Sequence, residues 1–317
     1  GSANVAVGHS ALEDNTSGSS NTALGREALH TNTTASNNVA IGKRALYLNT
    51  TGTNNSALGK DALNNNTTAS NNTAVGTAAL TANTTGAANT AVGNVSLTAN
   101  TTGSGNTAIG GGNTLDNNTT GSNNVAMGNN ALDANTTASD NTALGAGAMF
   151  ATTTGCQNVA VGRKALFTNI TGDNNTAIGH CALKVSTTDN NTALGHSALI
   201  ATTTGFGTAV GFNAMKANTT SSGGTAMGYQ ALCSNTTGDD NTAFGLETLS
   251  KNTTGSSNTA VGRDALEVNT TGSENTAVGR FALTSNTEGD QNTAIGRYSL
   301  GTNTTGEKNT ALGHSTV

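Results

Sequence analysis

The sequence predicts an all-β chain that winds as a parallel β-solenoid of about 19 short coils. The first observation behind this prediction is a glycine that follows a short run such as Asn-Thr-Ala-Val and recurs along the whole chain. Of the 18 intervals between successive glycines of this kind, 15 are 17 residues long, one is 18 and two are 16. The second observation is the composition: with 41 Gly, no Trp and only 3% aromatic residues, the chain cannot build a thick globular core. A fixed period and a thin core are typical of a solenoid, in which each repeat packs only against its neighbours.

We call the recurring residues the anchor glycines and count positions within a coil from them. They are Gly8, Gly25, Gly42, Gly59, Gly76, Gly93, Gly110, Gly128, Gly145, Gly162, Gly179, Gly195, Gly211, Gly228, Gly245, Gly262, Gly279, Gly296 and Gly313.

The three residues before each anchor glycine predict a short strand. Position −2 is Ala in every coil, position −1 is aliphatic or, once, Phe244, and position −3 is mostly Thr or Val. Such alternation with a period of two puts positions −3 and −1 on one side of the strand and Ala on the other. We expect the aliphatic residues to line the inside of the coil, and the small Ala face to contact another chain.

The remainder of the coil predicts a second strand and two turns. The pair Ala28-Leu29, repeated in most coils, indicates a second short strand with one aliphatic anchor, and Asn-Thr-Thr-Gly indicates a polar turn. Position −4 is Asn in 17 coils and Gly at Gly207 and Gly224. Because both residue types adopt left-handed backbone conformations at low cost, this position is interpreted as a corner with positive φ. The three irregular intervals are expected to fall in turns, which absorb length changes most easily.

Charge and hydropathy exclude several classes of partner. The net charge is −5 and only 10% of residues are charged, so we expect neither nucleic acid nor an anionic membrane as a partner. No apolar run approaches the roughly 18 residues that span a bilayer, so we expect no membrane insertion by this segment. Each coil carries only about two large aliphatic side chains, which favours a second buried surface through self-association.

The strand motif is similar to a known repeat. The runs NNVAIG (Asn37–Gly42) and NNVAMG (Asn123–Gly128), followed by two residues and Ala, resemble the NSVAIG repeats of YadA-like heads in trimeric autotransporter adhesins, and related repeats of phage tail fibres. The resemblance covers the full chain, although the period of 17 residues is longer than is usual in that family. It implies a left-handed β-roll, a homotrimer that is intertwined or side by side, and a position on the bacterial outer-membrane surface or in a phage tail fibre.

A few side chains depart from the repeat and are candidates for function. His9, His180, His196 and His314 follow an anchor glycine, in a column otherwise rich in Arg and Lys, which we interpret as a solvated edge. His180 and His196 lie in adjacent coils and are the one pair placed to share a surface ion, but no acidic or Cys partner is in register, so no metal site is expected. Phe206, Phe212 and Tyr229 cluster where two coils are short, and are the candidate binding residues for a sugar or a protein.

The pattern as a whole predicts a structural and adhesive fibre segment without catalysis or cofactor, whose partners are copies of itself and a host-surface glycan or protein. Residues 1-2 have the character of a cloning remnant, and residues 3-317 form one repeat domain, expected to be a fragment of a longer fibre. Two alternatives remain open. One is an ice-binding β-solenoid with Thr rows, suggested by Thr152–Thr154 and Thr202–Thr204, and the other is a purely structural phage tail-fibre shaft.

Overall fold

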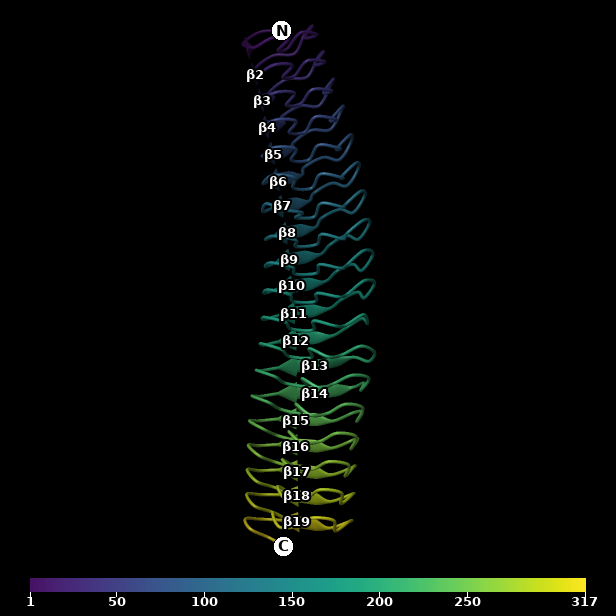
Figure 1. Ribbon diagram of the computed structural model, residues 1–317. Helices are drawn as coiled ribbons and strands as arrows, with labels where there is room; N and C mark the ends of the chain where they lie inside the picture. Colours follow the sequence, from purple (N-terminus) through teal and green to yellow (C-terminus); the bar gives the residue numbers. More distant parts are fainter. The chain divides into compact units, whose positions relative to one another are not determined.

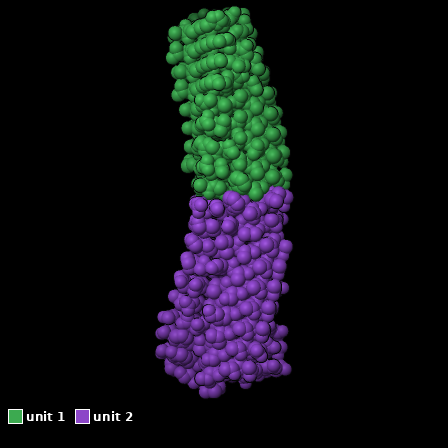
Figure 2. Space-filling view, in the orientation of Figure 1, with its two compact units in different colours: residues 1–158 green, residues 159–317 purple.

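The computed structural model describes all 317 residues and confirms the predicted fold class. The chain is an all-β parallel β-solenoid of about 18 turns with a repeat of about 17 residues, and it contains no helix. Its residues fall into two compact units, unit 1 (Gly1–Asn158) and unit 2 (Val159–Val317), which are coloured separately in Figure 2. Since it has no helix, it also has none that could cross a membrane.

Each coil contributes one strand, and within each unit the strands stack in chain order (Figure 1). Pairing is parallel and in register, so that Ala23 lies opposite Ala40 and Ala177 opposite Ala193. The strands of unit 1 are β1 (Val5–Val7), β2 (Thr22–Leu24), β3 (Val39–Ile41), β4 (Ser56–Leu58), β5 (Thr73–Val75), β6 (Thr90–Val92), β7 (Thr107–Ile109), β8 (Val125–Met127) and β9 (Thr142–Leu144). Those of unit 2 are β10 (Val159–Val161), β11 (Thr176–Ile178), β12 (Thr192–Leu194), β13 (Gly207–Val210), β14 (Gly224–Met227), β15 (Thr242–Phe244), β16 (Thr259–Val261), β17 (Thr276–Val278), β18 (Thr293–Ile295) and β19 (Thr310–Leu312).

The predicted second strand is wrong, because the Ala-Leu segment forms turns. The Ala28 N–H donates to the Gly25 carbonyl, and the Asn32 N–H donates to the Leu29 carbonyl, which closes two successive tight turns. Leu29 itself has a φ of 51°, in the left-handed region that a strand excludes. The turns still join neighbouring coils, since the Leu29 N–H donates to the Ala45 carbonyl. The coil-to-coil hydrogen bonding therefore continues beyond the three-residue strands.

The assignment of inner and outer faces is also corrected by the structure. The Ala at position −2 points into its own coil: Ala40, Ala91 and Ala177 are fully buried, as are Leu29 and its equivalents at position +4 away from the two chain ends. The aliphatic residue at position −1 points outward instead and is buried in none of the coils. Asparagine side chains fill part of the interior. The remaining space opposite Leu is therefore small, and only Ala fits there. Close packing thus explains the invariant Ala, without contact to another chain.

The asparagine at position −4 is fixed by its side chain and not by a positive φ. Positive φ occurs one residue earlier, for example 62° at Asn37, whereas Asn38 is not in that region. Asn38 is fully buried, its Nδ2 donates to the Gly52 carbonyl at 2.9 Å, and its Oδ1 accepts the Asn55 N–H at 2.9 Å. Each such amide therefore joins its coil to the next, and satisfies buried backbone groups that no water reaches.

Two coils lack this asparagine, and their glycines have a packing reason. A Cβ at Gly224 would overlap Cε of Met215, and one at Gly207 would lie 3.3 Å from the same atom. Met215 replaces the Leu of position +4, and its longer side chain occupies the space beside both glycines. The two Gly residues are thus not evidence for a left-handed corner.

The irregular intervals fall in turns, as predicted. Strands β11, β12 and β13 remain paired in register across the two 16-residue intervals, with Thr176 opposite Thr192 and Thr192 opposite Thr208. In the 18-residue interval, the extra residue lies in the glycine-rich turn after β7, and Gly111 there has open space around its Cα. The sheet is maintained because the turns take up each change in length.

A second row of buried asparagines runs along position +7. Asn66 Nδ2 donates to Asn49 Oδ1 at 2.8 Å, and Asn49 Nδ2 donates to Asn32 Oδ1 at 3.1 Å. In unit 1 the row reaches Asn135 and is interrupted there, because the next position is Thr152. Asn135 Oδ1 and Thr152 Oγ1 are both buried without a hydrogen-bond partner.

Replacing Thr152 by Asn is expected to stabilise unit 1 by about 1 kcal/mol. The new amide would donate to Asn135 Oδ1, as the equivalent amides do elsewhere in the row, and would relieve an unsatisfied buried acceptor. Chemical denaturation of the purified variant measures the change. Thr51→Asn, at an exposed position, is the control and should leave stability unchanged. A Thr152→Asn variant no more stable than the wild type would contradict this account of the row.

Candidate functional site

The outer surface of the coils carries every candidate site, because the interior is filled by Ala, Leu and Asn side chains. Three surface features stand out: an aromatic stack in unit 2, a ladder of ion pairs in unit 1, and a row of aliphatic side chains along the strands of both units. Each arises because one position of the repeat places equivalent residues of successive coils about 4.8 Å apart.

Two of the three predicted binding residues come together, and the third does not. The rings of Phe212 and Tyr229 stack with centroids 5.3 Å apart and planes inclined by 11°. Phe206 lies at the other end of strand β13, where it lines a shallow hollow with Asn190 and Gly223. All three side chains are exposed. The predicted site is therefore a pair of stacked rings, with Phe206 apart from it.

The stack extends beyond the two predicted residues and includes two of the histidines. His196 stacks on Phe212 with centroids 5.3 Å apart, and His180 stacks on His196 at 5.0 Å. His180 Nε2 also lies 3.5 Å from Arg163 Nη1, so a guanidinium continues the column. Because these four rings largely cover one another's faces, their edges form an exposed ridge. The structure groups no three His, Cys, Asp or Glu side chains that would hold a metal ion.

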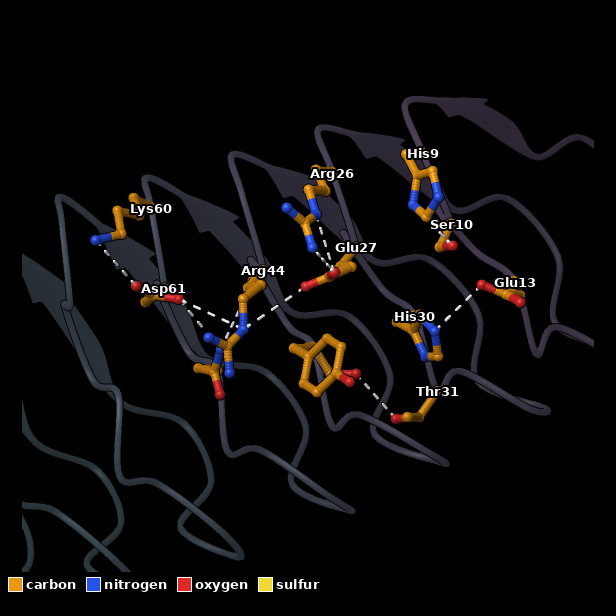
Figure 3. Close-up of polar contacts among 12 residues, drawn as sticks. His9, Ser10, Glu13, Arg26, Glu27, His30, Thr31, Arg44, Lys60 and Asp61 are labelled. Atoms are coloured by element: carbon orange, nitrogen blue, oxygen red, sulfur yellow. Dashed lines mark hydrogen bonds and ion pairs between the residues drawn. The ribbon is translucent and has the colours of Figure 1, made fainter.

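The basic column that was interpreted as a solvated edge carries ion pairs at its N-terminal end (Figure 3). Arg26 and Lys60 are mostly exposed, and each pairs with the residue that follows it, at 2.8 Å for Arg26–Glu27 and 3.7 Å for Lys60–Asp61. Arg44 lies between these pairs, with its Nε 3.9 Å from both Glu27 and Asp61. The hydrogen bond from Arg26 holds the pKa of the Glu27 carboxyl below its usual value. The structure thus adds a ladder of alternating charge to the predicted edge.

Asp116 and Asp133, in successive coils, differ from the ion-pair ladder because two like charges lie near each other. Asp133 is half-buried, and its Oδ1 has no hydrogen-bond partner. Burial raises the pKa of the Asp133 carboxyl above its usual value, and the negative charge of Asp116 raises it further. The folded state therefore binds a proton at Asp133 more tightly than the unfolded state does, so this group lowers stability at neutral pH.

Replacing Asp133 by Asn is expected to raise the stability of unit 1 at pH 7 by about 0.5 kcal/mol, a small value because the side chain is partly solvated. The gain should disappear as pH falls below the ordinary carboxyl pKa of about 4, where the wild-type group is protonated in both states. Urea denaturation of both proteins at pH 7 and pH 3 measures this difference. A gain of equal size at both pH values would show that charge is not its cause.

The aliphatic side chains at position −1 form a third surface, which we call the apolar row. In unit 1 it consists of Val7, Leu24, Ile41, Leu58, Val75, Val92, Ile109, Met127 and Leu144, and in unit 2 of Val161, Ile178, Leu194, Val210, Met227, Phe244, Val261, Val278, Ile295 and Leu312. Leu24 is 46% exposed, Leu58 48% and Met127 45%. A row of apolar side chains that are exposed or half-buried in every coil is unusual on a monomeric protein and is a candidate contact surface. Its sequence signal was the absence of any polar residue at position −1.

Comparison with known proteins identifies no relative. The chain matches no protein-family model, and no curated protein shows significant similarity to it. The similarity to YadA-like head repeats therefore rests on the strand motif alone, and supports proposals about function without establishing a family.

Proposed function

We propose that this chain is a non-enzymatic structural and adhesive fibre segment that assembles as a homotrimer on a cell or phage surface. The observation that carries the proposal is the apolar row, which is present in every coil and buried in none. The shared positions of the repeat support a structural role, since packing and hydrogen bonding account for the Ala, Leu and Asn of each coil. A β-solenoid repeat fold is consistent with that role.

The spacing of the apolar row favours copies of the same chain as its partner. Successive members lie one coil apart, about 4.8 Å, and a partner that covers them all needs apolar groups at the same interval. A second copy has that interval throughout its own row. Covering the exposed half of one such side chain contributes about 1 kcal/mol, so contact along many coils is needed to offset the cost of association.

The number of chains and the location come from the strand motif. The similarity of NNVAIG (Asn37–Gly42) to the repeats of YadA-like heads favours three chains and a position on the bacterial outer-membrane surface. The related repeats of phage tail fibres favour the same assembly as a shaft. In both settings the segment holds a binding part away from the surface, or contacts a target cell or matrix itself.

Sedimentation equilibrium at micromolar concentration tests the proposal. The expected mass is three times the 31.2 kDa of one chain, in low and in high salt, because apolar contacts do not depend on screened charges. A protein that remains monomeric at these concentrations would contradict the proposed assembly. A dimer would retain the apolar row as an interface but exclude the trimer.

A second candidate function, ice binding, is favoured by a row of exposed threonines. The runs Thr152–Thr154 and Thr202–Thr204 suggested it in the sequence. Their first residues, Thr152 and Thr202, are buried and face inward, whereas Thr154 and Thr204 are exposed. The exposed row lies at position +9, and in unit 1 contains Thr34, Thr51, Thr68, Thr85, Thr102, Thr120, Thr137 and Thr154. No Val interrupts this row, in contrast to position −3. Thermal hysteresis of the purified chain tests the function, and freezing identical to that of an inert protein at equal concentration would exclude it.

A further inference from the structure

A groove of about 480 Å³ opens on the surface of unit 2, over three successive coils. Its lining includes Ile200, Asn213, Lys216, Ala217, Gln230 and Cys233. Asn213 and Gln230 come from position +2 of their coils, and Ile200, Lys216 and Cys233 come from the equivalent position +5. The groove thus runs along the coils, between two columns of outward side chains.

In two other coils, a pair of side chains at positions +2 and +5 occupies the place that corresponds to the groove. In unit 1 the guanidinium of Arg44 (position +2) lies 5.2 Å from the ring centroid of Tyr47 (position +5). In unit 2 the ammonium of Lys164 lies 5.4 Å from the ring of Phe167 in the same way. Around the groove, position +2 carries the shorter Asn213 and Gln230, and no ring stands at position +5. The floor is left to Ile200, Ala201 and Ala217.

Three polar groups at this groove are available to a ligand. Lys216 forms no ion pair, and the side-chain amides of Asn213 and Gln230 make no hydrogen bond within the chain. Amides both donate and accept hydrogen bonds, whereas the ammonium only donates and carries a full positive charge. An apolar floor with a few convergent polar groups is the usual composition of a small-molecule site. The complementary ligand has an apolar face, several hydroxyls and one negative charge.

An extended peptide fits this groove less well. The backbone beneath it is already paired between coils, since the Met215 N–H donates to the Ala231 carbonyl and the Ala217 N–H to the Cys233 carbonyl. A peptide laid in the groove finds no free strand edge, so it gains no ladder of backbone hydrogen bonds there. A saccharide meets the same surface with hydroxyls that pair with side-chain amides, and with a C–H face that packs on Ile200 and the alanines.

We propose that this groove binds an acidic saccharide, with the sugar carboxylate against Lys216 and the sugar hydroxyls against Asn213 and Gln230. The exposed, stacked rings of Phe212 and Tyr229 directly precede the two amide residues in sequence, but do not line the groove. The biological meaning of this site rests on the proposed adhesive role, but binding by the groove is measured separately from chain assembly.

The experiment compares 3′-sialyllactose and trigalacturonate, which carry carboxylates, with neutral lactose, by isothermal titration of the full chain. Both acidic probes should saturate at millimolar concentration or below, should bind more weakly as salt rises, and should bind at least about tenfold more tightly than lactose. Lys216→Gln should weaken the binding of the acidic probes by about tenfold or more. Gln230→Ala should weaken the binding of the same probes by a smaller factor.

The chain offers a matched control in Lys184, which occupies position +5 of a nearby coil but does not line the groove. Lys184→Gln should leave binding unchanged. An equal effect of both lysine variants, equal binding of lactose, no saturation by either acidic probe, or full competition by oligoglutamate would each overturn the proposal. Sedimentation of each variant is measured in parallel, so that a lost trimer with intact sugar binding, or the reverse, separates this inference from the proposed assembly.

Discussion

Replacing Gly76 by Ala is expected to lower the free energy of unfolding of unit 1 by about 3 kcal/mol. Gly76 directly follows strand β5 and has a φ of 131°, a conformation that is essentially restricted to glycine. A Cβ at this position would also overlap the carbonyl group of Gly93 in the next coil. The coils would have to separate locally, which breaks the hydrogen bonds on both sides of the substitution.

Thermal unfolding followed by circular dichroism measures this effect, and the midpoint should fall by about 10 °C for a unit of this size. Gly111→Ala is the matched control, because Gly111 has no positive φ and nothing lies near its missing Cβ. That substitution should be neutral, or stabilising by about 0.5 kcal/mol through the unfolded state. Equal loss of stability in both variants would show that coil contact at the anchor glycines is not the cause.

Placing three aspartates in the apolar row is expected to convert the assembled protein to single chains. The variant Leu24→Asp, Leu58→Asp and Met127→Asp changes three of the most exposed members of the row in unit 1. Each aspartate removes an apolar contact and would bury a charge in the interface, which costs several kcal/mol unless the charge is paired. The side chains point away from the coil interior, so each coil should remain folded.

Sedimentation of this variant should give the mass of one chain, with the circular dichroism spectrum of the wild type. The control places three aspartates in the same coils at position +9, as Thr34→Asp, Thr68→Asp and Thr137→Asp. This control has the same change in net charge on a different face, and should remain assembled. If the variant in the apolar row stays assembled and the control dissociates, the interface lies on the threonine face and not on the apolar row.

The fold was predictable because the repeat itself reports which positions are constrained. The anchor glycines fixed the coil length, and the alternation around Ala40 identified the strand correctly. Which face of that strand points into the coil was not predictable. A three-residue strand with Ala on one side and Ile on the other can be buried on either side. The ambiguity is resolved by the two asparagine rows, which occupy much of the interior and leave room only for Ala.

The turns were the least predictable part of the coil. Leucine rarely adopts positive φ, so nothing in an Ala-Leu pair indicates the value of 51° at Leu29. The same holds for Asn38, whose position is Asn in 17 coils because the side-chain amide bridges two coils, and not because of its own backbone. In both cases the residue contacts the neighbouring coil, and the sequence of a single repeat does not show that contact.

The candidate site was predictable to the extent that the repeat places residues in columns. Phe212 and Tyr229 occupy the same position of adjacent coils, so their contact followed from the period. His180 and His196 were placed in that column, but their stacking on the rings was not predicted, because the column was interpreted as a solvated edge. The groove was not predictable, because it is formed by several short side chains in three coils. The absence of a long side chain and a ring at positions +2 and +5 gives no recognisable motif.

The buried amides also bear on how the chain folds. Because Asn38 accepts a hydrogen bond from Asn55 and Asn49 donates one to Asn32, both in neighbouring coils, an isolated coil would lose these hydrogen bonds of its interior. Formation of the first few coils should therefore be slow, and each later coil should add quickly onto a completed template, as in a one-dimensional cooperative array. Folding of such a chain is expected to be limited by nucleation, so the folding rate should depend on the formation of the first coils more than on the number of coils.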